Sequence, residues 1–236
     1  MAARILTITS GKGGVGKTTA TANLGVALAL NGQRVVTVDA DIGLRNLDVV
    51  MGLENRIVYD LVDVVEGRCR LRQAMIRHKQ LSELYLLPAA QTRDKTAVSP
   101  EDMVRLTDQL RPEFDFVIID SPAGIERGFK NAIAPADEIL IINRLRPDMI
   151  RRENMLATGD VVEVLAIDLI GIVPEDEHII ISTNRGRPAA MDDHSPAGQA
   201  FRNIAQRVMG EDVPFMAIRE SPGFLDRLAR LVRGHR

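Results

Sequence analysis

Residues 10–19 read SGKGGVGKTT, and this stretch decides the fold of the chain. It follows a short apolar run and precedes a helical pattern rich in Ala and Leu. Gly11, four further residues and then Gly16-Lys17-Thr18 match the phosphate-binding P-loop, in the strand–loop–helix context that the motif requires. Glycines let successive backbone N–H groups curl around phosphate oxygens, and the N-terminus of the next helix adds partial positive charge. The stretch therefore predicts a phosphate site, with Lys17 at the β- and γ-phosphates and the Thr18 hydroxyl on Mg²⁺; the alternative is a plain glycine-rich turn.

The composition limits what the rest of the chain can be. With 236 residues, 45% of them hydrophobic, the chain can bury a substantial core, which must be aliphatic because only 3% are aromatic. The net charge of −2 argues against a broad nucleic-acid-binding surface. The single cysteine, Cys69, excludes an intramolecular disulfide and any Cys-x-x-Cys site for zinc or an iron–sulfur cluster. We expect a cytoplasmic protein, since no signal peptide precedes the first apolar run and no run approaches the ~18 residues that span a bilayer.

Apolar runs and helical patterns alternate along the chain. This alternation predicts an α/β fold, a mostly parallel, doubly wound sheet of the P-loop NTPase type with helices on both faces. The predicted strands are residues 5–9, 35–39, 84–87, 116–120, 139–143, 169–173 and 178–182, and the predicted helices are residues 17–30, 99–110, 160–165 and 196–209. Ligands of such sheets bind at the carboxyl ends of the strands. We expect an ATPase domain over residues 1–220 and a separate tail over residues 221–236.

Three carboxylates follow apolar strands beside the P-loop. Asp39 ends VVTVD, Asp120 ends FVIID, and Asp41 comes two residues after Asp39. An acid at a strand end is often only a loop residue or a helix cap. Beside bound phosphates it gains a role, because Mg²⁺ keeps waters that nearby carboxylates can hold. Asp120 is therefore predicted to be the Walker-B-type acid, and Asp41, on a loop, to orient an attacking water.

Several segments resemble one family of ATPases. Residues 12–19 are similar to the deviant Walker A motif, which carries an extra lysine, here Lys12. Further segments resemble the MinD family, which places the bacterial division septum. They are residues 38–48 (VDADIGLRNLD), 120–126 (DSPAGIE), 142–145 (INRL), 171–176 (GIVPED) and 182–186 (STNRG). The resemblance covers most of the chain.

The resemblance implies an ATP-dependent homodimer with nucleotide between the two subunits. Lys12 would reach the partner's phosphates, a role like that of an arginine finger; the alternative is a solvated surface lysine. Asp41 would be catalytic with Lys12, while Thr18, Asp39 and Asp120 would hold Mg²⁺, the two acids through its waters. The Asn143 amide would contact the adenine edge, although alone it could be a strand-end turn residue. The full nucleotide-binding set would be Lys12, Gly13, Gly14, Val15, Gly16, Lys17, Thr18, Thr19, Asn143 and the backbone near Pro174.

The last residues form a second pattern. After Ser-Pro-Gly at 221–223, five apolar side chains fall within an arc of about 120° on a helix, with arginines opposite: Phe224, Leu225, Leu228, Leu231 and Val232. This pattern is typical of a helix in a membrane interface, and a last helix packed on the sheet or a frayed tail is the alternative. The resemblance favours an anionic membrane surface, which places the ATP-bound protein peripherally on the inner face of the cell membrane. Two such tails on one dimer would gain avidity.

One departure from the family falls after Glu138. The family has a further strand and helix before the strand that carries Asn143, so a unit of roughly 30 residues is expected to be missing here. In the family that helix helps to bind MinE and MinC, the partners that the resemblance implies. Three functions stay open: a membrane-cycling ATPase that positions the septum, a nucleotide-binding scaffold without effective hydrolysis, and a plasmid- or chromosome-partition ATPase that binds DNA.

Overall fold

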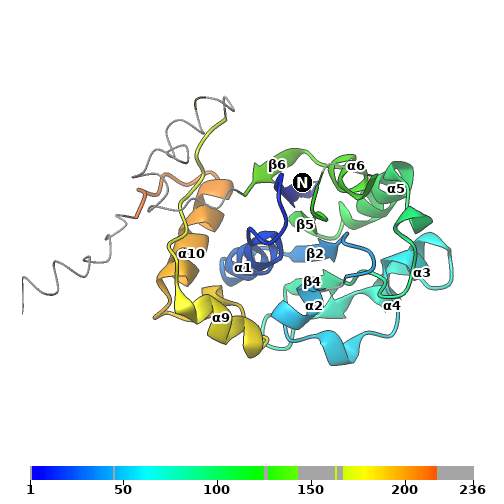
Figure 1. Ribbon diagram of the computed structural model, residues 1–236, viewed down its shortest axis with the longest axis horizontal. Coiled ribbons are helices and arrows are strands. Elements are labelled where there is room, and N and C mark those ends of the chain that lie inside the picture. Colours follow the sequence, from blue (N-terminus) through cyan, green and yellow to red (C-terminus); the bar gives the residue numbers. More distant parts are fainter. Residues whose placement is uncertain (1, 45, 125–126, 143–162, 164–166, 217–236) are drawn as a thin grey trace, which may run out of the picture.

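A six-stranded sheet lies at the centre of the molecule (Figure 1). This computed structural model describes residues 2–44, 46–124, 127–142, 163 and 167–216. The strands lie in the order β3-β4-β2-β5-β1-β6, and all neighbours are parallel except β3 and β4. Their bounds are β1 (Arg4–Thr9), β2 (Val35–Asp39), β3 (Ile76–Arg77), β4 (Leu84–Leu87), β5 (Phe116–Asp120) and β6 (Glu138–Ile141). The predicted α/β fold with a mostly parallel sheet is confirmed.

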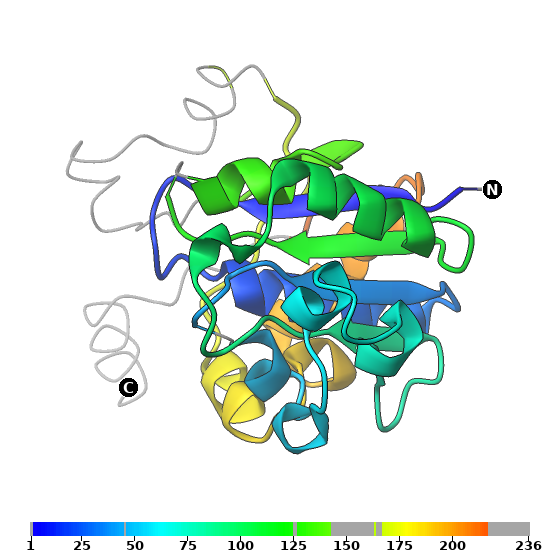
Figure 2. The same ribbon diagram turned by 90° about the vertical axis from the view of Figure 1, so that its right-hand side faces the viewer.

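Helices cover both faces of this sheet. Figure 2 shows α5 (Pro100–Leu110) and α6 (Arg127–Ile133) on one face, with α1 (Lys17–Leu30) and α10 (Pro196–Val208) on the other. Successive strand residues point to opposite faces, so Ile118 packs against the α1 and α10 side while Val117 and Ile119 pack against the α5 side. All five residues of β2 and of β5 are buried, as expected for central parallel strands covered on both faces.

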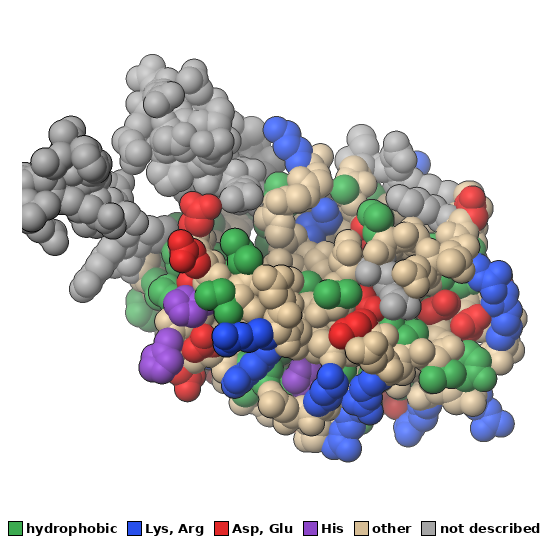
Figure 3. Space-filling view, turned by 60° about the horizontal axis from the view of Figure 1, so that its bottom comes forward, with side chains coloured by type: hydrophobic (Ala, Val, Ile, Leu, Met, Phe, Trp, Pro, Cys, Tyr) green, Lys and Arg blue, Asp and Glu red, His purple; other side chains and the backbone are tan. Residues whose placement is uncertain are grey.

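Short elements complete the described part of the chain. They are α2 (Leu47–Val50), α3 (Leu61–Val65), α4 (Leu71–Ala74), α9 (Glu177–Asn184) and three 3₁₀ turns, η1 (Glu54–Arg56), η2 (Lys95–Ala97) and η3 (Ala189–Met191). Among the described residues, no helix is long and apolar enough to cross a membrane. On the face shown in Figure 3, acidic and basic side chains both occur, with small hydrophobic groups between them.

Most predicted elements are found where the sequence places them. The strands at residues 5–9, 35–39, 84–87 and 116–120 and the helices at 17–30, 99–110 and 196–209 are confirmed within one residue at each end. The start of α5 follows from its cap: Ser99 accepts a hydrogen bond from the Asp102 N–H at 3.1 Å, and Pro100 occupies the first helical position. Asn143, almost all of the predicted helix at 160–165 and the tail from residue 217 lie outside the described residues.

Two predicted strands are wrong. Residues 169–173 have no regular secondary structure, and residues 178–182 lie inside the helix α9. The three consecutive isoleucines at 179–181 indicated a strand, because short β-branched runs favour one. The Asp176 carboxylate decides otherwise, since it accepts a hydrogen bond from the His178 N–H at 3.0 Å and so caps the start of α9.

The strand β6 forms one edge of the sheet. Among the described residues it pairs with β1 alone, and Leu140 packs against the core shared with α1 and α10. On the opposite face, Ile139 and Ile141 remain 47% and 45% exposed. The sheet is therefore fully covered at β1, β2 and β5 and only half covered at this edge.

Candidate nucleotide site

The loop between β1 and α1 has the conformation of a phosphate cradle. Gly14 and Gly16 have φ angles of 72° and 103°, which side chains rarely adopt. A Cβ atom on Gly11, Gly14 or Gly16 would meet no atom within 4 Å, so the space in front of the loop is open. No described side chain caps α1, whose N-cap residue is Gly16 and whose first turn carries no acid. The first N–H groups of α1 therefore point into an open, positively polarised space that suits phosphate oxygens.

Two lysines of this loop occupy different environments. Lys17 is only 8% exposed, and its Nζ donates to the Ser10 hydroxyl at 3.3 Å. That hydroxyl in turn donates to the carbonyl of Lys12 at 2.7 Å, which ties the two ends of the loop together. Lys12 itself is exposed. The structure thus holds Lys17 within the cradle and leaves Lys12 on the surface of the loop.

A pair of buried carboxylates lies at the carboxyl ends of two neighbouring strands. Asp39 of β2 stands opposite Asp120 of β5 in the strand register, and each is 1% exposed. Asp39 accepts hydrogen bonds from the N–H groups of Asp41 at 3.0 Å and Leu47 at 3.3 Å. Asp120 accepts one from the Thr21 hydroxyl of α1 at 3.3 Å. The predicted meeting of these two acids beside the P-loop is confirmed by their geometry.

The surroundings raise the pKa of both acids. Burial and the neighbouring charge of Asp120 bring the pKa of Asp39 to about 8, although the two N–H groups that it accepts oppose the shift. Burial also raises the pKa of Asp120 to about 7, although a hydrogen bond from Thr18 and the positive charge of Lys17 oppose it. The charge of Asp41 raises the pKa of both, which places Asp41 beside the pair. A divalent cation would remove this mutual repulsion.

These residues fit a magnesium ion that is bound mainly through phosphates and water. Among the described residues, no three carboxylate, imidazole or thiolate groups form a ready-made metal cage. Mg²⁺ does not need one, because it keeps several waters and takes few protein ligands, all of them oxygens. The Thr18 hydroxyl and the buried acids Asp39 and Asp120 supply such oxygens at one place. The donor set therefore suits Mg²⁺ bound with a nucleotide.

Pro174 lies half-buried just before α9, in a segment that Asp176 fixes. The Asp176 carboxylate accepts hydrogen bonds from the Ser195 hydroxyl at 2.6 Å and the Ala197 N–H at 3.1 Å, in addition to its cap on α9. Partial burial would raise the pKa of Asp176, but these hydrogen bonds and the His178 ring lower it to about 2. Asp176 therefore ties the start of α9 to the start of α10.

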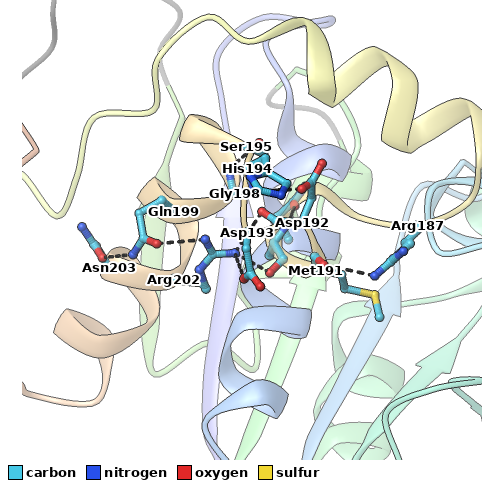
Figure 4. A network of polar contacts seen from close by, with 12 residues as sticks. Arg187, Met191, Asp192, Asp193, His194, Ser195, Gly198, Gln199, Arg202 and Asn203 are labelled. Atoms are coloured by element: carbon cyan, nitrogen blue, oxygen red, sulfur yellow. Dashed lines mark hydrogen bonds and ion pairs between the residues drawn. The ribbon is translucent and has the colours of Figure 1, made fainter.

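The segment before α10 is held by a second set of contacts. The Arg202 guanidinium of α10 donates to the carbonyl of Asp192 at 3.3 Å (Figure 4) and to that of Ala190 at 2.8 Å. Asn23 joins the same region to the P-loop helix, because its amide accepts from the Ala190 N–H at 2.7 Å and donates to the Thr19 carbonyl at 2.8 Å. The roles of Asn23, Thr21 and Asp176 were not predicted from the sequence. Only the spacing of Thr21, one turn after Lys17, could have indicated that it faces the site.

A hollow in the described part of the chain lies away from this site. A cavity of about 330 Å³ opens at the opposite edge of the sheet, where β4, β2 and β5 begin. Its lining includes the ion pair of Arg72 and Glu113, at 2.9 Å, and the ring of Tyr85. The lining of this cavity includes no residue of the P-loop and neither Asp39 nor Asp120. The nucleotide site therefore rests on the chemistry and geometry of the P-loop and these two acids.

Comparisons with known proteins identify the family of this chain. A family model described as an AAA domain matches residues 3–150. The septum site-determining protein MinD of Bacillus subtilis is 49% identical over 91% of this chain and 92% of its own length. The chain belongs to the MinD family. A chain of the solved MinC:MinD cell division protein complex from Aquifex aeolicus matches this structure with a TM-score of 0.82 and 40% identity. The match covers 92% of this chain and all of the Aquifex aeolicus chain. The septum site-determining MinD of Pyrococcus horikoshii, solved with Mg-ADP, matches with a TM-score of 0.78 and 29% identity, over 87% and 96% of the two chains.

The alignment with the B. subtilis MinD also bears on the length of this family member. It runs over 247 positions, whereas 91% of the 236 residues is about 215, so about 30 positions of the relative have no counterpart in the matched part of this chain. That number agrees in size with the strand–helix unit expected to be missing after Glu138.

Proposed function

We propose that this protein is an ATP-hydrolysing switch that positions the division septum. Mg²⁺ and ATP bound at the P-loop would make two copies dimerise, the dimer would bind an anionic membrane surface, and hydrolysis would reverse both steps. One observation carries the proposal: the buried pair Asp39 and Asp120 stands against a P-loop whose Lys17 is held inside the cradle. A family relative solved with Mg-ADP supports the choice of nucleotide.

The chain's own residues divide the work of hydrolysis. The N–H groups of the loop and of α1 hold the phosphate oxygens, and Lys17 neutralises charge on the β- and γ-phosphates. The metal, when bound, offsets the negative charge that develops on the transferred phosphoryl group. Asp39 and Asp120 would hold its waters, and Thr18 would offer it a hydroxyl. Asp41, beside the two acids, accepts a hydrogen bond from the attacking water and so orients it, while Lys12 of a second subunit supplies charge from across the dimer.

The base and the partners complete the proposal. Asn143 contacts the adenine edge and the backbone at Pro174 lies beside the base. MinC is proposed as a partner because a MinC:MinD complex is among the similar structures, and MinE follows from the family resemblance. The tail binds an anionic membrane through the five apolar side chains named above, with each arginine adding about 1 kcal/mol near anionic lipid.

Two measurements test this proposal. ATP turnover of the full chain is compared with that of Asp41→Ala, for which we expect a loss of about 100-fold or more with nucleotide binding retained. Equal turnover in the two proteins would refute hydrolysis at this site and leave a nucleotide-binding scaffold.

The membrane step is tested by co-sedimentation with vesicles of anionic phospholipid, in ATP and in ADP. We expect the full chain to bind in ATP only, and a chain that ends at Glu220 to bind in neither. Binding that ignores both nucleotide and truncation would refute the switch. Salt-sensitive binding to DNA, independent of the tail, would instead support the partition ATPase.

A further inference from the structure

Thr21 lies one helical turn after Lys17 on the face of α1 that looks at the carboxylate pair. The side chain is 0% exposed. Its hydroxyl oxygen is 3.0 Å from the Lys17 carbonyl and 3.3 Å from Oδ1 of Asp120. A hydroxyl has one hydrogen to donate, so the two acceptors share it. Thr21 is therefore one of the points where the P-loop helix contacts the acid at the end of β5.

The two acids of the pair are held by different parts of the fold. Asp39 is fixed by backbone N–H groups, those of Asp41 and Leu47, which belong to the loop after β2 and to the start of α2. Asp120 is fixed from α1, by the hydroxyls of Thr18 and Thr21. Thr18 is also the expected metal ligand, so Thr21 is the hydroxyl of α1 that can hold Asp120 without contacting the metal itself.

We propose that Thr21 is a positioning residue for the magnesium of the nucleotide site, because its hydroxyl fixes the Asp120 carboxylate in the orientation that faces the metal-bound waters. The inference rests on the proposed function, since it deepens the same site. Groups that orient a metal-binding side chain typically change metal affinity by about 10- to 100-fold when removed. The hydroxyl acts on the metal through Asp120, so affinity for nucleotide without metal should not depend on it.

The matched variants are Thr21→Val, Thr21→Ser and Thr107→Val. Valine keeps the shape of threonine and removes the hydroxyl, whereas serine keeps the hydroxyl and removes the methyl group. Thr107 of α5 is the control, because it is also buried, at 1% exposure, and its hydroxyl donates within its own helix to the carbonyls of Met103 and Val104, both at 2.9 Å. Thermal unfolding followed by circular dichroism checks that each variant is folded.

The readout is binding of a fluorescent ADP analogue by the full chain, titrated with Mg²⁺ and repeated in EDTA. Mg²⁺ is expected to raise the affinity for the ADP analogue. For Thr21→Val we expect the Mg²⁺ concentration that gives half of this rise to increase about 10- to 100-fold. The affinity of Thr21→Val for the analogue in EDTA should stay within about threefold of the wild type. Thr21→Ser and Thr107→Val should both stay within about threefold of the wild type in both conditions.

Each other outcome decides against the inference or against the site. An unchanged Mg²⁺ requirement in Thr21→Val overturns the inference, as does an equal loss in Thr21→Ser, which would assign the effect to packing. An equal loss of affinity in EDTA also overturns it, because Thr21 would then act on the phosphate cradle. If the wild type binds nucleotide identically with and without Mg²⁺, the proposed metal site itself fails.

Discussion

Asp39 and Asp120 should make the nucleotide-free protein less stable as the pH rises from about 4 to 8. Burial and the charge of Asp120 bring the pKa of Asp39 to about 8, and burial brings that of Asp120 to about 7, whereas the ordinary value is 3.8. Over this range the folded chain keeps protons that the unfolded chain has already lost. The free energy of unfolding therefore falls as the pH rises through the window between the unfolded and folded pKa values.

The size of the effect follows from one retained proton. One proton changes the free energy of unfolding by about 1.4 kcal/mol per pH unit, so one proton shared by the pair is worth at most about 3 kcal/mol between pH 5 and pH 7. Asp39→Asn removes the charge but replaces one of two accepting oxygens, at a cost of about 1–2 kcal/mol. We expect the variant to be less stable than the wild type at pH 5 and more stable at pH 7.5, by about 1–2 kcal/mol each.

Thermal unfolding in EDTA, without nucleotide, measures this crossing. The chain has no Trp, so far-ultraviolet circular dichroism is the suitable signal. For a chain of this size about 1 kcal/mol corresponds to about 2–4 °C in the melting temperature. Asp193→Asn is the control, because the Asp193 side chain is 97% exposed and its curve should run parallel to that of the wild type. Parallel curves for the wild type and Asp39→Asn between pH 5 and pH 7.5 would contradict the retained proton.

Three further predictions follow from single contacts. Lys17→Ala should reduce nucleotide affinity at least about 100-fold in a calorimetric titration, because the buried ammonium lies inside the cradle, and a smaller loss would remove Lys17 from the phosphates. Gly186→Ala should lower the free energy of unfolding in urea by about 2–4 kcal/mol, because the new Cβ would collide with Gly52. The control is Gly67→Ala, which also has a positive φ but lies in open space and should lose about 1 kcal/mol. Equal losses would contradict the close approach of Gly186 and Gly52. The pKa of Asp176 is lowered to about 2, because its hydrogen bonds outweigh its burial. The carboxylate should therefore contribute about 2–3 kcal/mol of stability that is present above about pH 4 and lost as the pH falls through about 2. If the melting temperature of Asp176→Ala depended on pH between about 2 and 5 as that of the wild type does, this prediction would be excluded.

The central part of the fold could be predicted because its signals are local. The apolar runs that end in Asp39 and Asp120 are long enough for buried strands, and the carboxyl ends of parallel strands meet at one edge. The P-loop adds a motif that fixes the strand before it and the helix after it. From these features the sequence predicts that the two acids and Lys17 lie close together, and they do so in the structure.

The region of α9 could not be predicted, because part of its support comes from distant residues. Three isoleucines in a row favour a strand, and the single N-cap residue Asp176 does not by itself outweigh that pattern. The helix exists because Asp176 caps it while also accepting hydrogen bonds from Ser195 and Ala197, which lie 19 and 21 residues further along the chain. The contact of Thr21 with Asp120 was not predicted for the same reason, because the two residues are 99 positions apart in the sequence.

The strands that carry the nucleotide site lie inside the sheet, while β6 forms its edge. The cradle and the two acids lie on β1, β2 and β5, and each of these strands has a paired neighbour on both sides. Their side chains are buried on both faces, so their positions depend on contacts that the described chain supplies. At β6, Ile139 and Ile141 stay nearly half exposed, and among the described residues no strand pairs with its outer side. An apolar edge strand favours association with other chains, so a loss of solubility should precede any loss of nucleotide binding in this protein.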